Sequence, residues 1–155
     1  MGVSRDNTGT DVSALGAYGK PLSFDVYLAI AEPGIRYAEV RSAFGLSLAK
    51  APSSRDAWRL KDCELFLTKG GGGRVTHISV HRPTANRSLW KGLFELLKSG
   101  NAVFFYPSDP LIPIVTDPRA VKLMPADMQE SFGGRPHVVH SVKELIDSLD
   151  LNEAV

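Results

Sequence analysis

Four histidines are the residues that most readily invite a metal site in this chain. His77 and His81 are four residues apart in an alternating segment, so they share one face of a strand but lie about 13 Å apart at ~3.3 Å per residue. One zinc ion, with bonds of about 2.0–2.1 Å to nitrogen, cannot join them. His137 and His140 are three residues apart and fall on opposite faces of a strand. We therefore predict no metal site and no cofactor.

Cys63 is the only cysteine of the chain. It stands between two carboxylates, which disfavour a thiolate, and it alternates with Leu65 and Leu67. We expect a buried core thiol. One cysteine cannot form an internal disulfide, residues 1–20 lack an apolar leader, and no stretch approaches the ~20 apolar residues of a membrane span. These features predict a soluble, cytoplasmic protein with no membrane partner.

Ser108 and Asp109 follow an apolar strand at its carboxyl end, where α/β proteins often place their sites. The same residues, followed by Pro110, fit an Asx-type turn. No serine, cysteine or carboxylate has a base at a spacing that marks nucleophilic or acid–base catalysis, so we predict no catalytic residue. A small hydrolase-like enzyme with a site near Ser108, Asp109 and the histidines is an alternative.

The elements that would position a site follow the order β-α-β-β-α-β. Alternating or apolar strands are predicted at Leu22–Ile30, Cys63–Lys69, Arg74–Arg82 and Ala102–Tyr106. Helices are predicted at Ile35–Phe44 and Arg87–Ser99, the second capped by Asn86. The four glycines 70–73 form a hairpin connection. This order predicts an α+β protein with a ferredoxin-like split β-α-β-β-α-β sheet; Ser47–Arg59 gives no clear element, and its Pro52-Ser53-Ser54 predicts an exposed loop.

A C-terminal α/β extension follows the core. It contains a short strand at Leu111–Thr116, a proline-started helix after Asp117, a strand at Pro136–His140 and a helix after the Ser141–Glu144 capping box. We divide the chain into a flexible arm (1–20) and one α/β domain (21–155), with core 22–106 and extension 107–150. An open question is whether the extension covers the sheet face opposite the two helices.

That second sheet face gathers the most promising side chains. Alternation along three strands places there Asp25, Tyr27, Glu64, Phe66, His77, Ser79 and His81. Exposed aromatics on a sheet can stack RNA bases, but Asp25 and Glu64 would repel phosphates. A mixture of aromatic, acidic and imidazole groups suits a protein partner better.

Charge is balanced overall, with a formal net charge of +1, so it offers no general attraction to nucleic acid or anionic lipid. The distribution is uneven: residues 117–155 hold seven acidic and four basic groups. Asp127 and Glu130 belong to this acidic segment. They are a second candidate for contact with a basic protein partner.

The stretches Phe24–Ile30, Ala102–Pro110 and Gly133–Leu149 give the chain a resemblance, in size and style, to small immunity proteins of bacterial contact-dependent growth inhibition and related polymorphic toxin systems. The resemblance covers most of Leu22–Leu149 but includes no diagnostic motif, and the chain is less acidic than many such proteins. It implies a cytosolic, non-enzymatic protein that binds and occludes a cognate toxin domain, for which a nuclease is the expected kind. A nucleic-acid-binding or small-ligand regulatory domain is an alternative, and the oligomeric state stays open.

Overall fold

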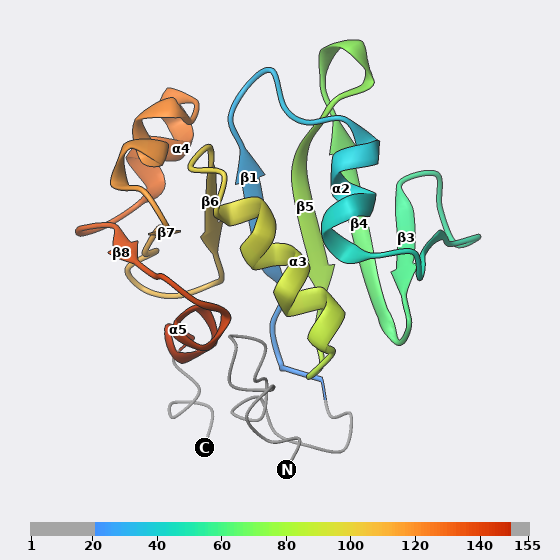
Figure 1. Ribbon diagram of the computed structural model, residues 1–155. Coiled ribbons are helices and arrows are strands. Elements are labelled where there is room, and N and C mark those ends of the chain that lie inside the picture. Colours follow the sequence, from blue (N-terminus) through green and yellow to red (C-terminus); the bar gives the residue numbers. More distant parts are fainter. Residues whose placement is uncertain (1–20, 150–155) are drawn as a thin grey trace.

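The computed structural model describes residues 21–149, so the predicted arm over residues 1–20 lies outside the described residues. Within this range the strands form one eight-stranded sheet in the order β2-β3-β4-β5-β1-β6-β7-β8 (Figure 1). Neighbouring strands are antiparallel except β7 and β8, which are parallel. The strands are β1 Val26–Ile30, β2 Leu48–Lys50, β3 Ala57–Leu60, β4 Cys63–Lys69, β5 Val75–His81, β6 Ala102–Phe105, β7 Ile114–Val115 and β8 His137–Val138.

Helices lie on both faces of this sheet. The pair α2 (Tyr37–Phe44) and α3 (Arg87–Leu97) lies across one face (Figure 1), and α5 (Val142–Asp147) packs on the same side against the main core. The 3-10 helix η3 (Pro118–Leu123) and α4 (Ala126–Ser131) pack against the opposite face. A short 3-10 turn, η2 (Gly71–Gly73), forms the hairpin between β4 and β5.

The predicted α+β class is confirmed, but the sheet is wider than a four-stranded ferredoxin-like sheet and its full strand order is different. Two strands precede β4 at one edge, and two short strands follow β6 at the other. None of the helices in residues 21–149 combines the length and apolar character that a membrane span requires.

Alternation along β1 explains how the sheet supports two separate cores. Val26, Leu28 and Ile30 point into the main core under α2 and α3, where each is buried. Ala29 points the other way and is 2% exposed, in a smaller core with Val103. Strand β6 has the same arrangement, as its continuous apolar run predicts for a strand covered on both faces.

Helix α3 begins as its sequence predicts. The Asn86 side chain accepts a hydrogen bond from the Leu89 N–H at 3.1 Å and donates one to the Leu60 carbonyl at 2.9 Å. The cap therefore satisfies a free amide of the first turn and fixes the helix to the end of β3. Farther along the helix, Gly92 lets α2 approach so closely that a Cβ there would lie 2.2 Å from the ring of Phe44.

The sequence gives no clear element for Ser47–Arg59, yet this segment contains β2 and most of β3. The exposed loop predicted at Pro52-Ser53-Ser54 is confirmed, since these residues are exposed and lie between the two strands. The connection between the two strands is held by Lys50, whose ammonium donates to the carbonyls of Ala51, Ser54 and Ala57. The same ammonium lies 5.7 Å from the centre of the Trp58 ring. Short strands stabilised by one side chain leave little periodic pattern in the sequence.

The extension divides between the two faces of the sheet. Its last helix, α5, starts at the predicted cap, where Ser141 accepts a hydrogen bond from the Glu144 N–H at 3.1 Å, and it joins the main core. The helices η3 and α4 instead form the smaller core on the other face, with Val115, Ala120 and Met124 buried at its centre. The open question of the sequence therefore has a mixed answer: part of the second face is covered.

Candidate functional site

The seven side chains predicted to share a sheet face lie on the face opposite α2 and α3, at paired or adjacent positions of neighbouring strands. We call the part of this surface formed by β3, β4, β5 and β1 the open face. Strand pairing sets Phe66 beside Ser79 and Ser79 beside Tyr27, and it sets Glu64 beside His81. His77 lies one pair farther along, beside Ala29.

An aromatic row crosses the open face and continues to β6. The row consists of Phe66, Ser79, Tyr27 and Phe105, in which Ser79 separates the ring of Phe66 from that of Tyr27. The Tyr27 and Phe105 rings stack with their centres 5.4 Å apart, and His77 lies 6.0 Å from Tyr27. Burial among these rings lowers the pKa of His77, which favours its neutral form. The surface is therefore apolar, rigid and only partly exposed.

A charged row runs beside the aromatic row. It consists of Arg59, Glu64, His81 and Asp25, one from each of β3, β4 and β5 and one just before β1. Nδ1 of His81 lies 3.2 Å from Oδ1 of Asp25, and the Arg82 N–H donates to the same oxygen at 3.0 Å. Part of this row lines a polar hollow of about 490 Å³.

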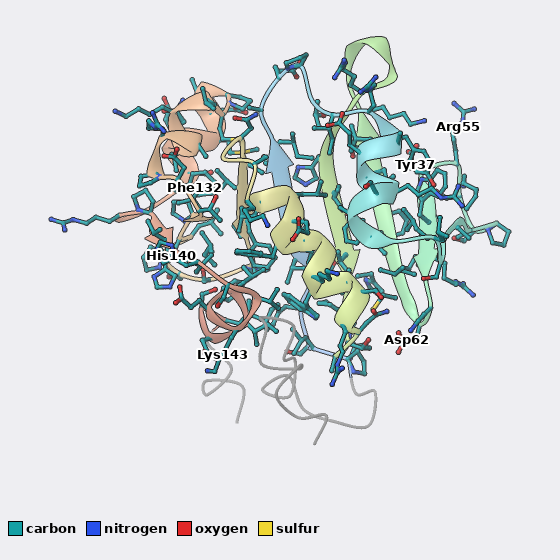
Figure 2. All side chains as sticks on the ribbon, viewed as in Figure 1. Tyr37, Arg55, Asp62, Phe132, His140 and Lys143 are labelled. Carbon is teal, nitrogen blue, oxygen red and sulfur yellow. The ribbon has the colours of Figure 1, made fainter. Side chains whose placement is uncertain are left out.

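The layer of η3 and α4 ends beside the aromatic row. Phe132 meets Phe105 edge to face with ring centres 5.6 Å apart, and Figure 2 shows Phe132 on the side of the molecule that carries α4 and β6. Asp127 and Glu130 are exposed on α4. The structure thus places these two predicted residues on the covering layer and the other seven on the sheet.

Ser108 and Asp109 line a different hollow of about 430 Å³, together with His137. The Ser108 hydroxyl lies 3.0 Å from the Pro110 carbonyl and 3.3 Å from the Tyr106 carbonyl. A hydroxyl that donates to a backbone carbonyl stabilises a turn, as the sequence pattern before proline indicates. This geometry does not activate Ser108 as a nucleophile, which needs a hydrogen bond to a base.

Cys63 belongs to a buried structural cluster. Its sulfur lies 3.2 Å from Oγ1 of Thr84, which is also 3.3 Å from both carboxylate oxygens of Asp62, and the Trp90 indole donates to the Thr84 carbonyl at 2.8 Å. Burial raises the pKa of the Cys63 thiol, so the thiol form predominates. Within residues 21–149 no group of three or more metal-ligating side chains is close enough to hold a metal ion.

Two members of this surface were missed by the sequence reasoning. Phe105 belongs to a run of apolar residues in which no alternation distinguishes one face from the other. Arg59 lies in the segment to which the sequence assigns no clear element, and its pairing with Glu64 in β3 and β4 places it in the charged row. The sequence offered little signal for Arg59, because the strand Ala57–Leu60 has only four residues and its two buried side chains, Ala57 and Leu60, are three positions apart.

The described residues thus form a mixed α+β protein with an eight-stranded sheet, one face of which is covered only in part. Comparisons of the chain with protein-family models, with curated proteins and with solved structures gave no match. The argument for function therefore depends on the surface itself.

Proposed function

We propose that this protein is a non-enzymatic binding domain that recognises another protein through its open face. The observation that carries the proposal is the aromatic row: Tyr27 and Phe66 are partly exposed on a sheet whose other side is fully packed. Aromatic side chains on a rigid support are typical anchors of protein interfaces, because little conformational entropy is lost when they are buried. The neighbouring charged row supplies polar contacts that fix the orientation of a partner.

The best-supported role is that of an immunity protein, which binds a toxin domain and blocks its active site. The resemblance in size and sequence style supports this role, as does the acidic pair Asp127 and Glu130, which is exposed on α4 and suits a basic nuclease. A standard interface buries about 800 Å² on each partner.

Two finer proposals accompany this one. The inner strands run in the order β4-β5-β1-β6, which is the order expected for the four strands of a ferredoxin-like core; we infer that β2, β3, β7 and β8 are additions to such a core. We also place the protein in the cytoplasm, because its one cysteine is a buried free thiol.

The first test is to express this chain together with the product of the adjacent reading frame and to purify the complex through a tag on this chain. We expect a stoichiometric complex whose partner is toxic when it is expressed alone, and we expect toxicity to disappear on co-expression. A neighbour that is neither toxic nor bound would refute the immunity role.

Substitutions then test the face itself. Tyr27→Ala and Phe66→Ala should each weaken the complex at least about tenfold, since central aromatic anchors contribute about 2 kcal/mol or more. Tyr37→Ala is the matched control: Tyr37 lies on α2, where it packs on Trp58 with ring centres 4.6 Å apart, on the other side of the sheet. Equal losses for all three variants, measured by calorimetry, would show that the open face is not the interface.

A further inference from the structure

The charged row alternates in sign across four neighbouring strands. Arg59 on β3 is basic, Glu64 on β4 is acidic, His81 on β5 is basic when it is protonated, and Asp25 next to β1 is acidic. Within one sheet this arrangement sets opposite charges side by side. The row is also complementary in charge to itself when its order is reversed.

A second copy can be placed face to face with the first by a twofold axis that runs parallel to the strands, over the midline between β4 and β5. Rotation about this axis reverses the strand order of the second copy and sets each row of one copy opposite the same row of the other. Arg59 of one copy then faces Asp25 of the other, and Glu64 faces His81. Each position of the row therefore meets its opposite. A symmetric dimer requires this kind of self-complementary surface, since the same patch serves both partners.

The aromatic row meets the same condition in side-chain size. The axis sets Phe66 of one copy opposite Ser79 of the other at two symmetric places, and both residues are partly exposed. Tyr27 comes opposite the position of Ala57, which is buried within its own chain and makes no contact of this kind. At the Phe66 and Ser79 positions a large side chain therefore meets a small one, which allows the two facing layers to interdigitate there. Two sheets packed face to face keep their strands within about 30° of each other, as an axis along the strands allows.

We propose that the open face binds a second copy of this chain, so that the free protein forms a symmetric sheet-to-sheet dimer. Glu64 already accepts a hydrogen bond at Oε2 from the Ser53 hydroxyl, at 2.7 Å. The other three charged groups of the row are accessible to a second copy. Arg59 is exposed, and within residues 21–149 its side chain makes no hydrogen bond or ion pair. The side chains of His81 and Asp25 keep 59% and 37% of their surface exposed, and the contacts of Asp25 to His81 and to the Arg82 N–H both use Oδ1.

Size determines how strong this dimer can be. Four strands at about 4.8 Å spacing and two rows of side chains give a contact smaller than the ~800 Å² per partner of a standard interface. The dimer should therefore be weak and concentration-dependent, with a dissociation constant between about 1 μM and 1 mM. This inference concerns the free protein and does not depend on the proposed toxin partner, which would compete with the second copy for the same face.

Analytical ultracentrifugation of the purified chain, over a concentration series reaching about 1 mM, tests the proposal directly. We expect a reversible monomer–dimer equilibrium that shifts toward monomer as salt is raised, because the ion pairs are near the surface and are screened. A chain that is monomeric throughout the series overturns the dimer, whatever the co-expression experiment shows.

Charge exchange tests the register of the two copies. Arg59→Glu sets a carboxylate opposite Asp25 at two symmetric places, so it should weaken the dimer at least about tenfold, and Asp25→Lys should do the same. The double variant restores opposite charges and should recover most of the affinity. The matched controls are Lys98→Glu and Glu95→Lys on α3, which make the same charge changes on the other side of the molecule.

The outcomes of this exchange are decisive. Recovery in the double variant, with unchanged association in both controls, supports the symmetric register. Single variants that associate normally, or a double variant that stays monomeric while its circular dichroism and thermal unfolding match those of the wild type, overturn it. Asp25→Lys removes contacts within the chain, so Arg59→Glu, which removes none of the described contacts, is the variant on which the result depends.

Discussion

At the scale of single residues, His77 should make stability depend on pH. Burial lowers its pKa, so the unfolded chain binds a proton at this imidazole more readily than the folded protein. Stability therefore rises with pH at this site: the contribution is complete above the unfolded value of about 6.5 and is lost as pH falls toward the lower folded value. We expect His77→Gln to lose less stability than the wild type between about pH 7.5 and pH 5.5 in urea unfolding. His140→Gln, at an exposed histidine, is the control, and equal pH dependence of wild type and His77→Gln would contradict the prediction.

Single-residue features were predictable where an elementary rule fixes the geometry. Alternation placed seven side chains on the open face, and the cap at Asn86 formed as its residue type indicates. Phe105 was not predictable in the same way, since a strand buried on both faces carries no alternation. Its contact with Phe132 joins residues 27 positions apart, and no local pattern encodes that distance.

At the scale of elements, the crossing of α2 and α3 depends on Gly92. Alanine there would place its Cβ 2.2 Å from the ring of Phe44, which is 2% exposed and has little room to move. Overpacking costs about 1–3 kcal/mol, against a gain of about 1 kcal/mol in helix propensity. We expect Gly92→Ala to lower the free energy of unfolding by roughly 1 kcal/mol or more in urea titration. Gly71→Ala, in the hairpin with nothing within 4 Å of its Cβ, should be nearly neutral; a stabilised Gly92→Ala would show that the helices can separate without loss.

Elements were predictable in proportion to their length and periodicity. The seven-residue strand Cys63–Lys69 was predicted with its observed bounds, and the amphipathic helix α3 with its correct start. Strands β2 and β3 were missed because three or four residues do not complete a pattern, and because Lys50 stabilises the turn between them through backbone carbonyls that any sequence carries. The unrecognised pair widened the sheet and brought Arg59 to the open face.

At the scale of the whole molecule, the sequence could not determine which face the extension covers. The helices η3 and α4 are short, and α5 has its own apolar stripe, so local pattern permits either face for each. Long-range packing decides: α5 completes the main core, whereas η3 and α4 close over the small core around Ala29 and Val103. The open face exists because this second layer ends at the aromatic row.

Two cores of unequal size on one sheet predict two levels of stability. The small core is held by few buried side chains, and its helices η3 and α4 have no buried residue beyond Ala120, so this layer should open at a lower free energy than the sheet. In native-state hydrogen exchange, we expect amides of η3 and α4 to exchange before those of β1 and β5. Phe132→Ala should lower the opening free energy of that layer by about 1–2 kcal/mol and leave the sheet amides unchanged, because Phe132 is only partly buried. Leu123→Ala, at a side chain that is 51% exposed, is the control and should have little effect. One common exchange free energy for both groups of amides would instead mean that the layer and the sheet unfold together, and that the border of the open face is as rigid as its centre.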